Sequence, residues 1–292
     1  KIWRGIRQML DREYPQAALV SEWSHPQRAI NNAGFHADFY LDHKGNGYHS
    51  LFRSTDAQGN NDSFFCKDAA GDITRFTREY EKNLLETKDQ GYISFITGNH
   101  DTPRLRRNLD EKAALLACCT IFTLPGVPFL YYGDEIGMRY IEGLKSKEGG
   151  FSRTGSRTPM QWSRGKNLGF SQADEEKIYL PVDSSKDAPT VEDQLRDEQS
   201  MLHTVRRILK LRNENEELQA DGPYETLYAE KNKYPFLYKR GSFIFAVNPS
   251  AKEERAPFAF AGQEIFSVGS CRFAQQSIIM EPQSFCVYKL KG

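Results

Sequence analysis

The sequence predicts an α/β fold followed by an antiparallel β-sandwich. Short apolar segments alternate with longer amphipathic segments as far as about residue 215, which is typical of βα units around a parallel sheet. From about residue 221, aromatic and β-branched runs recur without helices between them, as in a sandwich. A (β/α)8 barrel contains eight βα units, and only four are visible here. The first part is therefore predicted to be half of such a barrel, or a four-stranded open sheet.

Hydrophobic spacing places the individual elements. Residues 2–14 repeat apolar side chains at helical spacing, and Pro15 ends that helix. The strands of the parallel sheet are predicted at residues 17–22, 36–41, 92–97 and 127–132. The later helices are predicted at residues 76–87, 111–124 and 198–212.

Residues 113–132 carry no charge over about the length of a bilayer crossing. Pro125 and Gly126 interrupt this segment, which predicts a buried helix, a turn and a buried strand in place of a membrane span. Cys118 and Cys119 are adjacent on that helix, and the sequence contains no ligand spacing such as C-x-x-C. The cysteines are therefore predicted to be small core residues.

The predicted domain boundary lies near Gly222 and Pro223. Residues 1–220 would form the partial barrel, and residues 221–292 would form the C-terminal β-sandwich. A long polar loop at residues 133–197 interrupts the first part, and loops of that length are usually functional or disordered. The strands of the sandwich are predicted at residues 224–229, 234–239, 242–247, 257–260 and 284–290.

Composition limits the classes of partner. The 292 residues include 39 Lys and Arg against 39 Asp and Glu, which gives a formal net charge of +0. A nucleic acid or an anionic membrane would favour a basic surface, so neither is expected as a partner. The sequence shows no signal peptide and opens at Lys1 in a helical pattern, so it indicates no compartment and suggests that the chain starts inside a longer protein.

Polar residues follow three of the predicted strands, where the chemistry of parallel sheets and barrels is found. Glu22 ends the first strand, residues 99–101 (Asn-His-Asp) end the third, and residues 134–135 (Asp-Glu) follow the fourth. Each also has a structural explanation when taken singly. Glu22 could form a salt bridge, residues 99–101 could begin a helix before Pro103, and residues 134–135 could shape a turn.

Taken together, these segments resemble the α-amylase family of retaining glycoside hydrolases. The resemblance rests on LVSEW (19–23), FITGNHD (95–101), PGVPFLYYGDEIGM (125–138) and GSRTPMQW (155–162). The last segment, with NLGF (167–170), resembles the branch of α-glucosidases, oligo-1,6-glucosidases and trehalose synthases. The resemblance implies that the four strands are strands five to eight of a (β/α)8 TIM barrel.

The resemblance also implies roles for individual residues. Glu22 matches the family's general acid/base, which protonates the glycosidic oxygen. Asp101 matches the carboxylate that holds sugar hydroxyls and helps to distort the ring, and His100 matches an imidazole that hydrogen-bonds the same sugar. Arg104 is expected to be a charge partner of the acidic site, and Asn99 to shape the turn; both are placed with His100 among the substrate-binding residues. Residues 134–135 are expected to organise the strand end and not to react.

One part of the family's catalytic set is missing from this sequence. The nucleophile of the family is an Asp in a G-F-R-x-D-like segment at strand four, and no Asp of this chain has that context. The chain is therefore expected to be a C-terminal fragment that is inactive alone. Its open half-barrel face is expected to associate with itself or with the missing half.

The expected ligand is an α-glucan oligosaccharide, cleaved at α-glucosidic bonds with retention. Two alternatives stay open: glucosyl transfer or isomerisation within the same family, and a non-catalytic sugar-binding or scaffold relative. No cofactor is expected, because acid/base and covalent glycosyl chemistry needs none. Calcium is often bound by the family through a segment absent from this sequence, so no metal site is expected here.

Overall fold

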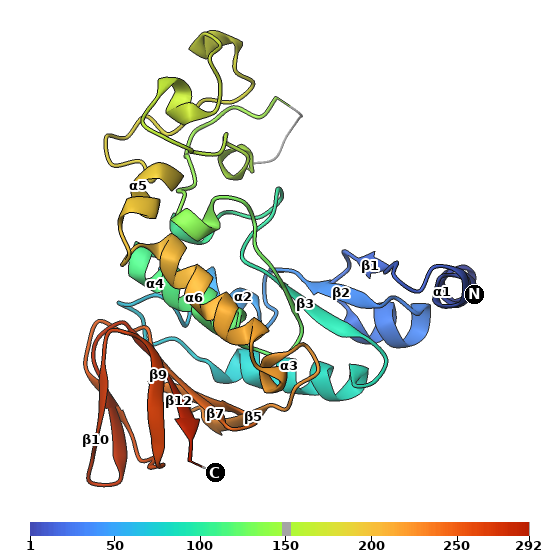
Figure 1. Cartoon of the computed structure of the whole chain (residues 1–292), viewed down its shortest axis with the longest axis vertical. Helices are drawn as coiled ribbons and strands as arrows, with labels where there is room; N and C mark the ends of the chain where they lie inside the picture. The colour runs from blue at the N-terminus through green and yellow to red at the C-terminus, as the bar shows by residue number, and fades with distance from the viewer. Residues whose placement is uncertain (148–152, 292) are drawn as a thin grey trace.

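A four-stranded parallel sheet forms the first part of the fold (Figure 1). The structure is a computed structural model that describes residues 1–147 and 153–291. The strands pair in the order β1-β2-β3-β4, and each neighbouring pair is parallel. Their bounds are β1 Val20–Ser21, β2 Ala37–Tyr40, β3 Tyr92–Ile96 and β4 Val127–Phe129. The four predicted strands are thus present, although the first and last are shorter than the sequence pattern indicated.

Helices connect the strands close to the predicted positions. The prediction missed the seven-residue π-helix Gln27–Ala33 and the single-turn α2, His49–Phe52. Their apolar residues are too few to show a period, so the sequence pattern gave no signal for either. The other helices are α1 Ile2–Glu13, α3 Thr74–Thr87, α4 Glu111–Ile121, α5 Val191–Arg196 and α6 Met201–Asn213.

Helix α1 lies at one end of the molecule, next to β1 (Figure 1). Its apolar side chains repeat at helical spacing as predicted, yet none of its residues is buried. Ile2 is 78% exposed and Trp3 is 50% exposed, with the Trp3 ring contacting Phe35 at a centroid distance of 5.1 Å. The amphipathic face is therefore only partly covered: Ile6, Met9 and Leu10 are half-buried, and Ile2 and Trp3 are exposed.

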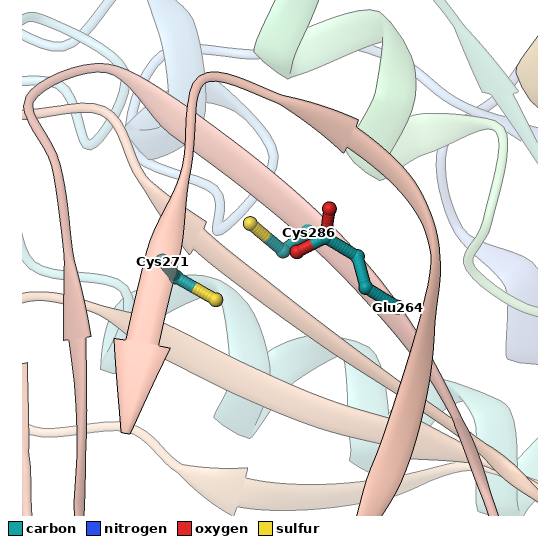
Figure 2. Close-up of side chains that lie close together, drawn as sticks. All are labelled: Glu264, Cys271 and Cys286. Atoms are coloured by element: carbon teal, nitrogen blue, oxygen red, sulfur yellow. The ribbon is translucent and has the colours of Figure 1, made fainter. Parts of the chain in front are cut away.

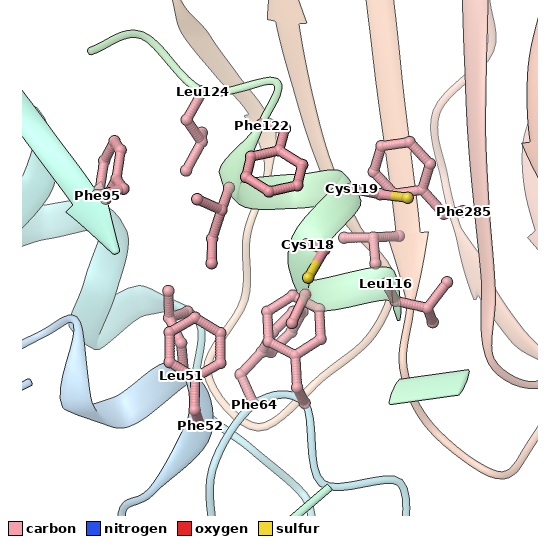
Figure 3. Packing of buried hydrophobic residues seen from close by; sticks show 14 of the residues in the cluster. Leu51, Phe52, Phe64, Phe95, Leu116, Cys118, Cys119, Phe122, Leu124 and Phe285 are labelled. Carbon is pink, nitrogen blue, oxygen red and sulfur yellow. The ribbon is translucent and has the colours of Figure 1, made fainter. Parts of the chain in front are cut away.

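Helix α4 is the most deeply buried helix of the core. Asp110 caps its first turn by accepting a hydrogen bond from the Ala113 backbone N–H, and every residue from Ala113 to Ile121 is buried. Figure 3 shows Cys118 and Cys119 on this helix among aromatic and aliphatic side chains, which confirms their prediction as core residues. Elsewhere Cys286 is also buried, but Cys66 and Cys271 are only partly so.

The turn after α4 accounts for the uncharged run at residues 113–132. Gly126 adopts φ +107° between α4 and β4, and a Cβ at this position would lie 2.3 Å from the Ile93 carbonyl oxygen. Only glycine fits such an approach without displacing backbone. Among the residues that the structure describes, no helix combines the length and apolarity required for a membrane crossing.

Two antiparallel sheets form the C-terminal part, as predicted for a sandwich. One has five strands in the order β5-β6-β7-β12-β9, and the other has three in the order β10-β11-β8. The strands are β5 Glu225–Tyr228, β6 Phe236–Arg240, β7 Phe243–Asn248, β8 Glu254–Ala256, β9 Gly262–Val268, β10 Cys271–Ala274, β11 Ser277–Met280 and β12 Ser284–Leu290.

The predicted strand at residues 257–260 was wrong. The strand β8 ends at Ala256, and Pro257 follows it without a backbone N–H for a ladder. Phe258 and Phe260 instead pack against the smaller core cluster between the two sheets. The aromatic run is therefore explained by packing outside regular strand structure.

Two buried arginines hold the end of α4, one from the C-terminal sheet and one from α6. Arg240, on β6, is fully buried and donates to the Thr123 and Gln219 carbonyls at 2.5 and 2.6 Å. Arg212, on α6, donates to the Phe122 carbonyl at 2.9 Å, beside the C-terminal end of α4. These side chains satisfy carbonyl groups that the end of a helix leaves without intrahelical partners. One continuous apolar cluster spans both parts, so the division at residue 220 stays a prediction.

The predicted long loop at 133–197 contains short 3-10 turns and α5 in its described residues. Residues 148–152 of that prediction lie outside the described part of the chain. Figure 1 shows this segment projecting beyond the ends of α4 and α6. Its residues Arg153 and Arg157 return to the strand ends and contact Asp101.

Candidate functional site

The carboxyl ends of β1 and β3 meet through Asn99. The Asn99 side-chain amide donates to Glu22 Oε1 at 3.3 Å, while its Oδ1 accepts from the backbone N–H groups of Asp101 and Thr102, each at 2.8 Å. One side chain therefore fixes the turn after β3 and contacts the carboxylate after β1. Glu22 and Asp101, two of the predicted site residues, are brought to the same edge of the sheet, and both are exposed to solvent.

A buried carboxylate holds the segment that carries Glu22. Asp38, on β2, accepts hydrogen bonds from the Ser21 hydroxyl at 2.5 Å, the Trp23 backbone N–H at 3.2 Å and the His25 backbone N–H at 2.8 Å. These donors flank Glu22 on both sides. Burial raises the pKa of Asp38, although the hydrogen bonds oppose that rise. Sequence reasoning missed Asp38, and its signal was a lone charge inside the apolar strand 36–41.

The backbone beside Glu22 adopts a rare conformation. Ser24 has φ +60°, in the left-handed region that residues other than glycine seldom occupy. Its Oγ accepts a hydrogen bond from the Leu41 backbone N–H at 2.9 Å, which anchors the turn to the chain after β2. The orientation of Glu22 is thus set by contacts on either side of it and not by the strand alone.

Two arginines from the long loop engage Asp101. Arg157 Nη2 lies 3.1 Å from Asp101 Oδ1, and Arg153 also forms an ion pair with this oxygen. His100 Nε2 lies 3.6 Å from the same atom, and the His100 carbonyl accepts from Arg157 Nε at 2.7 Å. The predicted site residues His100 and Asp101 are therefore held next to each other and next to guanidinium groups. Neither arginine was predicted, although both flank or lie in the quoted GSRTPMQW segment.

Arg104 pairs with the buried carboxylate of Asp134 and not with Glu22 or Asp101. Its side chain is fully buried, and Nη1 lies 3.0 Å from Asp134 Oδ1 and 2.6 Å from the Tyr132 carbonyl. Its guanidinium also lies 4.8 Å from the centroids of the Tyr131 and Tyr132 rings. A fully buried side chain presents no surface to a sugar, so the expectation that Arg104 contacts substrate does not fit this structure. Its contacts with Asp134 and Tyr132 instead fix the segment that follows β4.

Asp134 is buried, and Glu135 is partly buried. Asp134 accepts from the Thr97 hydroxyl at 2.7 Å, which links the ends of β3 and β4. Burial raises the pKa of Asp134, with Arg104 opposing it, and burial also raises the pKa of Glu135. The structure therefore places Asp134 where it organises the strand ends.

The strand ends thus present an exposed carboxylate at Glu22, a second one at Asp101 paired with arginines, and the exposed indole of Trp23. An exposed carboxyl group can donate or accept a proton, and an aromatic face can pack against a sugar ring. In the described part of the chain, side chains grouped closely enough to hold a metal ion occur in the C-terminal strands and not at these strand ends.

Comparison with known proteins gives a match over most of the first part. A family model described as "Alpha amylase, catalytic domain" matches residues 1–221. A salivary alpha-glucosidase of Aedes aegypti is 33% identical over 188 residues, covering 58% of this chain and 31% of that protein. An amino acid transporter heavy chain of Mus musculus is 34% identical over 138 residues, covering 44% of this chain and 19% of that protein.

Solved structures share the fold at low identity. Isomaltulose synthase from Erwinia rhapontici superposes with a TM-score of 0.78 at 19% identity, covering 100% of this chain and 59% of that one. This chain therefore spans well under two thirds of the length of these relatives. The family match covers both strand ends described above, and its fold is a TIM-barrel-type α/β domain followed by a C-terminal sheet domain. The chain belongs to the alpha-amylase family.

Proposed function

We propose that this chain carries the acid/base part of the active site of an enzyme that cleaves α-glucosidic bonds of small oligosaccharides with retention. The observation that supports this most directly is the bridge through Asn99, which joins the Glu22 carboxylate to the turn bearing Asp101. In this proposal Glu22 protonates the leaving oxygen and then takes a proton from water. Asp101 and His100 hold hydroxyl groups of the same sugar.

The ion pairs of Asp101 limit how a sugar can bind this carboxylate. Arg153 and Arg157 both contact Asp101 Oδ1, so a sugar that uses this carboxylate must share it with them or displace them. Charge-assisted hydrogen bonds from arginine are stronger than those from neutral groups. The long loop is therefore proposed to fix the position of Asp101 in the sugar site through these two arginines. Trp23 is proposed to pack against the sugar as an apolar wall.

The nucleophile is proposed to come from residues outside this sequence. A retaining enzyme needs two carboxyl groups about 5–5.5 Å apart, and Glu22 has no second carboxylate with the family's nucleophile context here. The outer edge of β1 has no partner strand among the described residues, and the apolar face of α1 is only partly covered. These features support a half-barrel that associates with a complementary half, or with a second copy.

The sequence immediately upstream of Lys1 in the encoding gene provides the first test, since a G-F-R-x-D segment there would supply the nucleophile. The chain is then produced together with that segment and assayed on maltose and on an aryl α-glucoside. Glu22→Gln is expected to abolish maltose hydrolysis. Glu13→Gln, an exposed glutamate on α1, is the matched control and is expected to keep it.

Azide identifies the role of Glu22 in that assay. With an aryl α-glucoside, Glu22→Ala still forms the glycosyl-enzyme, and azide then attacks it without a general base. The proposal predicts α-glucosyl azide as the product. A β-glucosyl azide would show that Glu22 is the nucleophile, and no rescue together with unchanged maltose hydrolysis in Glu22→Gln would refute any catalytic role.

A glucosyl transferase or isomerase is the second candidate, because isomaltulose synthase shares the fold over the whole chain. A non-catalytic scaffold is the third, because a transporter heavy chain is among the relatives. Product analysis in the same assay separates these candidates. Free glucose indicates hydrolysis, new disaccharides indicate transfer or isomerisation, and no turnover with the complementary segment present indicates a scaffold.

A further inference from the structure

A β-bulge turns Glu264 toward the interior of the C-terminal part. On β9 and β12, Phe266 pairs with Val287 and Glu264 pairs with Tyr288, so one extra residue, Ile265, stands on β9 between the two pairs. Without this bulge, Glu264 and Phe266 would point to the same face of the sheet. A bulge re-aims a side chain in this way, and here it brings a carboxylate to the face that carries Tyr288.

Two thiols share this face with Glu264. Cys286, on β12, points into the space between the two sheets, and Cys271 reaches it from β10 of the other sheet (Figure 2). The two sulfurs and a carboxylate oxygen of Glu264 all lie within 4.8 Å of one another. The Tyr288 hydroxyl lies 2.8 Å from the Cys271 sulfur and donates to Glu264 Oε2 at 2.9 Å.

We propose that Cys271, Cys286 and Glu264 form a binding site for a thiophilic divalent cation of the Zn²⁺ class, placed between the two sheets of the C-terminal part. Two thiolates and one carboxylate are ligands that Zn²⁺ accepts, and three protein ligands leave a fourth position for water. Cys286 is buried while Glu264 is exposed, so the ion would have one ligand in the interior and could enter from solvent beside Glu264. This proposal does not depend on the proposed glycosidase activity.

Binding releases protons from the site. Each thiol must lose its proton to become a ligand, so the reaction is Zn²⁺ plus two thiols giving a bis-thiolate complex and two protons. Affinity is therefore expected to fall as the pH is lowered. The Tyr288 hydroxyl is placed to orient the carboxylate as a neighbour of the ligands.

The test uses the full chain, reduced and freed of metal, with Co²⁺ as a spectroscopic probe. One equivalent of Co²⁺ is expected to give the near-ultraviolet charge-transfer band of thiolate-bound cobalt, and Zn²⁺ is expected to remove it. Cys271→Ser is expected to lose the band. Cys66→Ser changes the other partly buried cysteine and is expected to keep it.

Glu264→Gln is the variant that avoids a folding artefact, because this side chain is exposed whereas Cys286 is buried. It is expected to keep the charge-transfer band but to bind Co²⁺ at least about tenfold more weakly. The proposal is overturned if the reduced chain shows no charge-transfer band, if the band survives in Cys271→Ser, if it disappears in Cys66→Ser, or if Glu264→Gln binds Co²⁺ unchanged.

Discussion

The buried pair of Arg104 and Asp134 gives the sharpest energetic prediction. Asp134→Ala removes the carboxylate beside a guanidinium that is fully buried and whose Nε and Nη2 have no hydrogen-bond partner among the described residues. What remains around the cation is the Tyr132 carbonyl and the faces of Tyr131 and Tyr132. Breaking a buried pair from one side costs about 3–5 kcal/mol, because the remaining charge is left uncompensated.

Removing both charges should cost much less. Burial raises the pKa of Asp134 in spite of Arg104, which indicates that ion pairing does not fully offset the loss of hydration. In the double variant Arg104→Met with Asp134→Ala, no buried charge remains. We therefore expect the loss in free energy of unfolding of the double variant to be well below the sum of the losses of the two single variants.

Urea denaturation followed by circular dichroism measures these free energies for the unmodified chain, both single variants and the double variant. The coupling energy of the cycle is expected to be at least about 2 kcal/mol, toward the upper part of the range seen for contacting residues. A loss below about 1 kcal/mol for Asp134→Ala, or strictly additive losses, would refute the reasoning. It would mean that Arg104 is exposed to solvent in solution and is available to substrate.

Three further predictions concern single positions. Asp38→Ala leaves the Ser21 hydroxyl and the His25 backbone N–H without their acceptor. Urea denaturation should therefore show that the free energy of unfolding falls by about 1–3 kcal/mol. An unchanged midpoint would contradict the role of Asp38 in holding the segment that carries Glu22. Burial alone would raise the pKa of Asp42, but the ion pair with Arg53 outweighs burial and gives a net lowering of this pKa. The Asp42 carboxylate therefore stabilises the fold at pH values above its unfolded pKa of about 3.9, and this contribution is lost as the pH falls further. The stability difference between the unmodified chain and Asp42→Asn, measured from pH 7 to pH 2, should therefore shrink below about pH 4, and a constant difference would refute the ion pair. Gly126→Ala should lower the thermal midpoint, because its Cβ would collide with backbone, and an unchanged midpoint would contradict the close approach.

Periodicity predicted most of the first part of the fold. Residues 92–97 and 111–124 have strong apolar patterns, and the structure has β3 and α4 there. Strands β8 to β11 were all missed. Exposed positions such as Gln263 and Arg272 dilute the apolar alternation of β9 and β10, and β8 and β11 are only three and four residues long. The exposure of α1 could not be predicted either, since an amphipathic pattern shows that a face is apolar and does not show what covers it.

Only the part of the site that follows from the parallel direction of the strands could be predicted from the sequence. The carboxyl ends of parallel strands share an edge, so Glu22 and Asp101 could be expected near each other. The contacts of Arg153 and Arg157 depend on how the long loop folds back, which local spacing does not encode. Arg104 was expected to be a charge partner of the acidic site, and it does pair with a carboxylate, but that carboxylate is the buried Asp134, and local spacing does not encode this burial.

The central claim is that Glu22 provides the acid/base chemistry while the nucleophile lies outside this sequence. The most direct measurement is the hydrolysis of maltose and of a chromogenic α-glucoside by the purified 292-residue chain, beside its Glu22→Gln variant. The account predicts that both preparations are inert. Turnover by the unmodified chain that Glu22→Gln abolishes would contradict it, because this chain would then hold a complete catalytic set.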